Sequence, residues 1–154
     1  MNKDDASAVA LQRPTDFFTP DEIAYLREVD SWRSSLAIAH CWAVIIGAWI
    51  VVCLFPNPIT ITLGVMIIGT RQLGLFVLTH DGAHGVLYKN RRLNDWVCEW
   101  LLNRPFTDEK IDNYRKYHVV HHANTQQETD PDLVLSKPFP ITKSSFPVSY
   151  THLT

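Results

Sequence analysis

Residues 36–55 read LAIAHCWAVIIGAWIVVCLF, and residues 59–79 read ITITLGVMIIGTRQLGLFVLT. The first run carries no Asp, Glu, Lys or Arg, and as a helix it is long enough to cross a bilayer core of about 30 Å. Pro56-Asn57-Pro58 between the runs is a short uncharged turn. The two runs therefore predict a helical transmembrane hairpin, although Arg71 in the second run is costly in lipid. The alternative for the first run is a buried core helix.

Basic residues predict the orientation of this hairpin. They flank both outer ends and are absent from the turn: Lys3, Arg13, Arg27, Arg33, Lys89, Arg91 and Arg92. The positive-inside rule then places both flanks in the cytoplasm. Residues 1–35 contain no apolar signal core, so we interpret them as a cytoplasmic segment. Thr19-Pro20-Asp21-Glu22 within it predicts a capped helix that runs to about Arg33.

A third apolar pattern follows the hairpin at residues 93–103. Apolar side chains recur at helical spacing on one face: Leu93, Trp96, Val97, Trp100 and Leu101. Polar side chains occupy the opposite face: Asn94, Asp95, Glu99 and Asn103. This pattern predicts an amphipathic helix at the membrane interface, with a surface helix of a soluble domain as the alternative. After Asp130 we expect mostly irregular chain, because Pro138 and Pro140 break helices.

Five histidines fall in two clusters after the second apolar run. His80 and His84 form an H-x-x-x-H pattern, and His118, His121 and His122 form an H-x-x-H-H pattern. Residues three and four apart share one face of a helix. Neutral imidazole is a ligand of zinc, copper, iron and nickel. The sequence therefore predicts a metal site on the cytoplasmic side, rather than five unrelated structural histidines.

Other residues near the clusters are candidates for supporting roles. Metal-bound histidines usually donate their second ring N–H to a carboxylate or carbonyl. Asp81, Asp130 and Asp132 could serve in this way, with solvated charges or turn residues as the alternative. We expect Gly82 and Gly85 to allow close helix packing. We expect Arg115 and Lys116 to lie on a solvated face, with lipid phosphates or an acyl-carrier headgroup as alternative partners.

Composition excludes several classes of function. The net charge is −2 with no dominant basic stripe, so no nucleic-acid partner is expected. Three well-separated cysteines without a C-x-x-C pair argue against a disulfide framework, a zinc ribbon, an iron–sulfur site and a c-type haem. A glycine-rich nucleotide-binding motif is also absent. A redox enzyme of this composition would need a separate electron donor.

HDGAH at residues 80–84 and HVVHH at residues 118–122, after a hydrophobic hairpin, resemble the integral-membrane fatty acid desaturase family. The resemblance covers about residues 71–145 and extends to related carotenoid ketolases, hydroxylases and alkane monooxygenases. It implies an all-α membrane fold and a non-haem di-iron centre that activates O2 and dehydrogenates an acyl chain. The iron ligands implied are His80, His84, His118, His121 and His122. A ferredoxin or a cytochrome b5-like protein would supply electrons.

Other functions remain open at this point. Hydroxylation or ketolation of a carotenoid or sterol-like lipid is compatible with the same two clusters. A metal-transport protein is disfavoured, because His40 and Arg71 are the ionisable residues well inside the apolar runs. A membrane protein that binds metal without catalysing a reaction is a further alternative.

The sequence departs from the family pattern after residue 122. The family has a third H-x-x-H-H and a second helical hairpin, which these 154 residues do not contain. We therefore interpret residues 36–147 as a partial desaturase domain whose di-iron site is completed elsewhere, and we expect the chain alone to be inactive. Residues 148–153 read VSYTHL, one reading frame of a common transposon-based sequencing adapter. We interpret residues 148–154 as adapter read-through and exclude His152 as a ligand, with native loop residues as the alternative.

Overall fold

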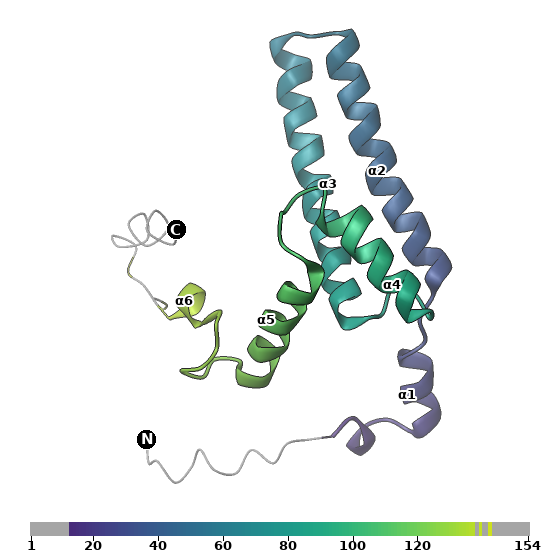
Figure 1. Ribbon diagram of the computed structural model, residues 1–154, viewed down its shortest axis with the longest axis vertical. Coiled ribbons are helices and arrows are strands. Elements are labelled where there is room, and N and C mark those ends of the chain that lie inside the picture. The colour runs from purple at the N-terminus through teal and green to yellow at the C-terminus, as the bar shows by residue number, and fades with distance from the viewer. Residues whose placement is uncertain (1–12, 138, 140–141, 143–154) are drawn as a thin grey trace.

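The computed structural model describes residues 13–137, 139 and 142, and every regular element in this part of the chain is helical (Figure 1). In chain order the elements are the 3-10 helix η2 (Pro14–Asp16), α1 (Pro20–Leu26), α2 (Ser31–Leu54), α3 (Pro58–His84), α4 (Arg91–Val97), the π-helix η3 (Cys98–Asn103), α5 (Ile111–Asn124) and α6 (Leu133–Ser136). The predicted all-α class is confirmed. The residues interpreted as adapter read-through lie outside the described residues.

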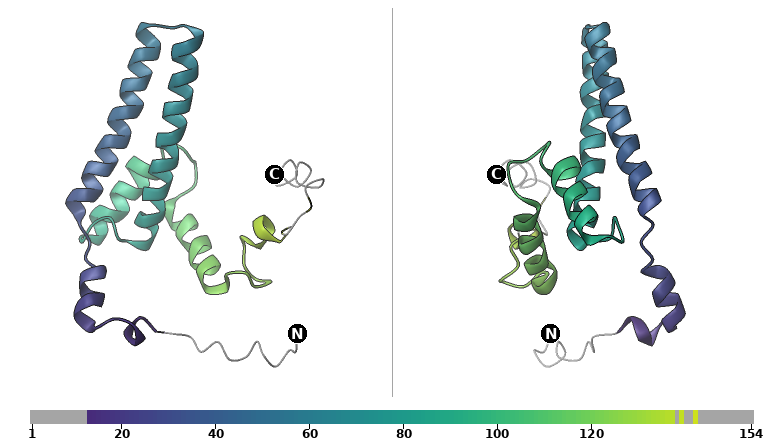
Figure 2. Two further views of the ribbon diagram at one scale, coloured as in Figure 1. Left: turned by 180° about the vertical axis from the view of Figure 1, so that it is seen from behind. Right: turned by 45° about the vertical axis from the view of Figure 1, so that its right-hand side comes forward.

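The two apolar runs form an antiparallel helical hairpin, as predicted. α2 and α3 lie side by side in both views of Figure 2, and the turn between them is at the far end from α5. Asn57 begins α3 by accepting hydrogen bonds from the N–H groups of Ile59 and Thr60. At about 1.5 Å per residue, the 24 residues of α2 and the 27 of α3 span about 36 and 40 Å. Both helices exceed the thickness of a bilayer core.

The outer surface of the hairpin is apolar along its length. Only 11% of the residues in the most hydrophobic window of each helix are buried. Large side chains such as Trp49, Ile59 and Val65 are more than half exposed. A water-soluble protein seldom exposes so much contiguous apolar surface, whereas lipid solvates it. The exposure therefore favours two membrane-spanning helices over the soluble core helix considered as the alternative.

The helix bounds differ from the predicted ones at the polar ends. α1 ends at Leu26 rather than near Arg33, and α2 begins at Ser31. The reason is Asp30, whose side chain accepts hydrogen bonds from the N–H groups of Trp32 and Arg33 and so starts a new helix. At its other end, α3 continues through His84. The first histidine cluster thus lies on the last turns of a spanning helix.

The buried core lies at the histidine-bearing end of the hairpin, where α4 and η3 pack against α2 and α3. Its members come from all four elements and from the turn after α3: Ile38, Cys41, Leu75, Leu87, Val97 and Leu102. Trp42 of α2 donates a hydrogen bond from its Nε1 to the carbonyl oxygen of Leu101, 3.1 Å away. This packing fixes α4 and η3 beside the last turns of α3.

The predicted amphipathic helix is present, but two residues of its polar face, Asn94 and Asn103, are buried rather than solvated. Residues 91–103 form α4 followed by the π-helix η3, and Asn94 and Asn103 are buried while Trp96 and Trp100 are more than half exposed. The carboxamide of Asn94 donates to Gly82 O and accepts from Leu87 N. Backbone groups at the end of α3 have no partners within the helix. The hydrogen bonds that Asn94 makes to them explain why this polar side chain is buried rather than exposed to solvent.

The two glycines of the first histidine cluster have different roles. A Cβ at Gly82 would collide with the Sγ of Cys98, so Gly82 allows η3 to approach α3 closely, as predicted. Gly85 instead ends α3 in the left-handed region, with φ of +78°. Glycine adopts that conformation without the steric cost that a Cβ brings.

The N-terminus of α5 is capped from η3 rather than by its own N-cap residue. Lys110, at the N-cap position, makes no side-chain cap hydrogen bond. The Glu99 carboxylate accepts a hydrogen bond of 2.8 Å from the N–H of Ile111 and pairs with Arg104 Nε at 2.7 Å. This arrangement attaches the start of α5 to η3.

Replacing Glu99 by Gln is expected to lower the free energy of unfolding at pH 7 by about 1 kcal/mol. Burial alone would raise the pKa of Glu99, but the hydrogen bonds from Ile111 and Arg104 outweigh it, so the pKa lies below 4.5. Such a carboxylate stabilises the fold above its unfolded-state pKa and loses this contribution as pH falls.

The wild-type chain should therefore lose stability below pH 4.5, and Glu99→Gln should lose less of it there. Unfolding by sodium dodecyl sulfate, followed by far-ultraviolet circular dichroism at several pH values, measures both effects. Equal acid sensitivity of the two proteins would contradict the role of the Glu99 carboxylate.

Candidate metal centre

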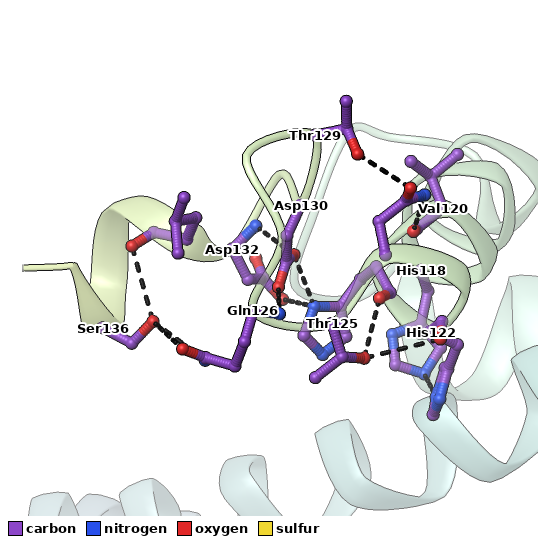
Figure 3. A network of polar contacts seen from close by, with 12 residues as sticks. His118, Val120, His122, Thr125, Gln126, Thr129, Asp130, Asp132 and Ser136 are labelled. Carbon is purple, nitrogen blue, oxygen red and sulfur yellow. Dashed lines mark hydrogen bonds and ion pairs between the residues drawn. The ribbon is translucent and has the colours of Figure 1, made fainter. Parts of the chain in front are cut away.

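Four of the five predicted histidine ligands converge where α5 crosses the end of α3. His80 and His84 come from α3, and His118 and His122 come from α5. One ring nitrogen from each lies within 4.8 Å of those from the others. His118 Nε2 is 3.0 Å from the Nε2 atoms of both His84 and His122. Figure 3 shows the facing rings of His118 and His122.

Hydrogen bonds among these rings cannot provide every ring nitrogen in the cluster with a partner. A ring nitrogen of neutral imidazole carries either one proton or one lone pair. His118 Nε2 therefore cannot make good hydrogen bonds to both of its neighbours at once. Burial, followed by the charges of His80, His122 and other neighbouring histidines, lowers the pKa of His118 to about 4. The ring is then neutral at pH 7, the state in which it binds metal.

The shortest distances between ring nitrogens in the cluster are those expected around a single metal ion. Histidine nitrogens bind a metal such as zinc at about 2.0–2.1 Å, which places neighbouring ligand atoms about 3 Å apart. The closest pairs in the cluster match this spacing. An all-imidazole donor set suits zinc, copper, iron or nickel. The cluster of His80, His84, His118 and His122 could thus hold one ion, with His118 at the two closest pairs.

His121 is the predicted ligand that lies apart from this group. Its Nδ1 is 2.7 Å from Asp130 Oδ1 and 3.3 Å from Asp132 Oδ2. The remaining ring nitrogen, Nε2, is the atom through which His121 could bind a metal. The hydrogen bond to Asp130 raises the pKa of His121, while burial opposes this shift.

Asp130 is a fully enclosed carboxylate, with 0% of its side chain exposed. Figure 3 shows it on the loop after α5, where it accepts hydrogen bonds from the N–H groups of Gln126 and Asp132. Burial alone would raise the pKa of Asp130, but the hydrogen bonds from His121 and these two N–H groups lower it overall. The loop therefore presents a fixed negative charge to His121.

The other two predicted carboxylates also lie beside histidines. Asp81 Oδ1 is 3.3 Å from Nδ1 of its neighbour His80. Asp132 contacts His121 and accepts a short hydrogen bond from the hydroxyl of Tyr117. Each of the three carboxylates is thus placed where it could orient an imidazole ring.

Sequence reasoning missed Tyr114 as part of the site. Its ring stacks on His118 with centroids 5.4 Å apart and planes inclined by 9°, and its edge meets Phe76 of α3. Tyr114 precedes His118 by four residues, so helical spacing alone could have identified it as a neighbour.

A largely apolar groove of about 810 Å³ adjoins the cluster at Tyr114. α3, η3, α5 and the loop between the last two contribute its walls, chiefly through Gln72, Leu73, Phe76, Leu102, Phe106 and Tyr114. Its size lies within the usual range for sites that take small molecules. The same aromatic side chain thus borders both the groove and the histidines.

Comparison with known proteins gives two matches. Residues 56–153 match the sequence profile described as fatty acid desaturase. Over 83 residues, or 53% of the chain, the sequence is 31% identical to a zeaxanthin 4-ketolase of Chlamydomonas reinhardtii. That match covers 19% of the ketolase, so the chain spans about a fifth of the length of this relative. No solved structure matches the chain.

Replacing His118 by Ala is expected to weaken Co²⁺ binding at least about 100-fold, because His118 lies centrally among the four rings. Equilibrium titration of the chain in lipid nanodiscs, followed through the visible absorption of Co²⁺, measures the affinity. His40→Ala is the matched control, since His40 lies in α2 outside the cluster. Tight binding by His118→Ala would rule out a shared ion among these rings.

Proposed function

We propose, from the premise that this chain belongs to the fatty acid desaturase family, that it serves an iron- and O2-dependent oxidation of a lipid chain. Desaturation of an acyl chain is the reaction we favour. The observation that supports it most is the four-histidine cluster at the rim of a membrane-spanning hairpin, next to an apolar groove. A metal site that acts on a water-soluble substrate needs no membrane hairpin or apolar groove beside it, whereas a site that acts on a lipid chain needs both.

The histidines divide between two metal positions in this proposal. His80, His84, His118 and His122 would hold one iron, and His121 would contribute Nε2 to a second iron whose other ligands lie outside the described residues. Iron, when bound, supplies the oxygen-dependent redox chemistry that no amino-acid side chain provides. The protein side chains supply neutral nitrogen ligands, and Asp130 fixes the ring of His121 from behind.

The apolar groove is the part of the site that we assign to the substrate chain. Phe76, Leu102 and Phe106 offer apolar surface to a hydrocarbon, and their contact with it would exclude water. Tyr114 ends the groove against His118. A hydrocarbon bound along these residues would have its C–H bonds near the histidine cluster.

The reaction requires an external source of electrons. Removal of two hydrogen atoms from neighbouring carbons supplies two electrons and two protons. Reduction of one O2 to two waters takes four of each, so a donor must provide two further electrons, with two protons from solvent. Without a nucleotide, haem or iron–sulfur motif in the sequence, we propose a separate ferredoxin or cytochrome b5-like partner. In this proposal the donor approaches from the cytoplasm, the side on which the positive-inside rule predicts the histidines to lie.

Ketolation of a carotenoid is the second candidate, and the similarity to the zeaxanthin 4-ketolase favours it. The same metal cluster could oxidise a ring methylene stepwise to a carbonyl group. An elongated terpenoid is also apolar enough for the groove. The two candidates differ in product: desaturation removes two hydrogens from an acyl chain, whereas ketolation adds oxygen to a carotenoid.

The protein in its full natural length is expected to introduce double bonds into host acyl lipids when it is expressed with iron and O2. Mass spectrometry of extracted lipids and added carotenoids identifies the product. His118→Ala should abolish the product, because it removes one of the four proposed ligands of the first iron. His40→Ala should still form the product. A carotenoid carbonyl product would favour the second candidate. Iron binding with neither product would favour a non-catalytic metal protein.

Asp130→Asn is expected to weaken metal binding through His121 by about 10- to 100-fold, the usual effect of removing a carboxylate behind a ligand. Asn keeps the shape of the side chain but removes the negative charge that orients the imidazole. The number of irons bound per protein, which includes the second position that His121 would serve, measures the change, and Asp108→Asn, at an exposed position before α5, is the matched control. Equal iron content of the two variants would disprove the role of Asp130.

A further inference from the structure

Arg115 joins three helices at the edge of the histidine cluster. Its Nε donates to the carbonyl oxygen of Ala83 at 2.9 Å, and its Nη2 donates to Asp95 Oδ1 at 2.7 Å. Its Nη1 pairs with Asp112 at 2.6 Å, and only 20% of the side chain is exposed. The sequence led us to expect a solvated face at this residue, and the structure contradicts that expectation.

The partners of Arg115 are fixed parts of the fold. The carbonyl of Ala83 lies in the last turn of α3, where backbone oxygens have no helical partner and attract positive charge. Asp95 belongs to α4 and also pairs with Arg91 at 3.3 Å. The planar guanidinium can satisfy both acceptors at once, which a lysine ammonium at the end of a flexible chain does poorly.

Helical spacing connects these contacts to the metal ligands. Arg115, His118 and His122 occupy positions i, i+3 and i+7 of α5, so their side chains lie along one stripe of that helix. Ala83, the acceptor on α3, immediately precedes His84. Anchoring Arg115 to Ala83 therefore sets the rotation of α5 at which His118 and His122 face His84. Glu99, on η3, also holds α5, but it does so at the first N–H of the helix, one turn before Arg115 and away from the histidines.

We propose that Arg115 is a positioning residue, which aligns the histidines of α5 with those of α3 for metal binding. The inference rests on the proposed metal site, since it assigns how that site is assembled. Loss of the guanidinium leaves all the ligands in the chain but allows α5 to rotate away. Arg115 variants should therefore bind metal with altered geometry while retaining their helices.

The test compares Arg115→Lys and Arg115→Ala with Lys116→Gln in nanodiscs, using Co²⁺ as the probe. Lys116 is exposed and adjacent on α5, so its variant controls for the loss of positive charge. We expect about tenfold weaker Co²⁺ binding for Arg115→Lys, and still weaker binding for Arg115→Ala. The energies of the visible Co²⁺ bands should shift in both, because they report ligand geometry. Millimolar ethylguanidinium should partly restore the wild-type spectrum of Arg115→Ala.

Wild-type affinity and spectrum in a helical Arg115→Ala would overturn the proposal. If Arg115→Ala fails to fold, Arg115→Lys and Asp95→Asn decide, and unchanged spectra in both overturn it equally. His118→Ala separates this failure from failure of the metal site itself. If His118→Ala loses Co²⁺ binding while the Arg115 variants bind as the wild type does, only the role of Arg115 is disproved. If His118→Ala still binds Co²⁺ tightly, the proposed metal site itself is disproved.

Discussion

The close approach of imidazole nitrogens around His118 is the constraint on which the rest of the structure depends. Two other ring nitrogens lie 3.0 Å away, and protons alone cannot satisfy all three. The rings come from two helices that are 34 residues apart at their nearest histidines, so no local turn holds them together. Their convergence must be stabilised by contacts elsewhere, or by a cation that accepts all the lone pairs.

The contacts that hold the two helices together lie at the end of α3, where the chain passes from apolar to polar surroundings. A helix that leaves lipid has carbonyl and N–H groups that need partners. Asn94 contacts the backbone of Gly82 and Leu87, and Arg115 contacts that of Ala83. These bonds satisfy the helix end and simultaneously join α4 and α5 to it. The same residues that terminate the spanning helix therefore also define the geometry of the histidine cluster.

The parts that sequence predicts well are those set by local spacing. The apolar runs predict the hairpin because each spanning helix is determined by the apolar character of its own residues. The intervals between the histidines likewise predict which rings share a helix face. The inward positions of Asn94 and Arg115 could not be predicted in this way. Both residues are polar and would be solvated on an isolated helix. Here Asn94 is buried and Arg115 is largely enclosed, because both contact the end of α3, which is distant from Arg115 in the sequence. The separation of His121 from the other four rings likewise depends on Asp130, which lies on a loop nine residues further along.

The groove and the histidines share one face of α3, so an apolar molecule in the groove would lie beside the candidate metal centre. Gln72, Phe76 and Thr79 border the groove, and His80 and Ala83 follow them at intervals of one to four residues. At 3.6 residues per turn these positions form one stripe along the helix. An extended hydrocarbon lying in the groove would therefore run beside α3 toward His80 rather than across it. Tyr114, stacked on His118 and edged against Phe76, stands where that path meets the rings. Tyr114 thus connects the wall of the groove to the imidazole rings, whatever the groove binds.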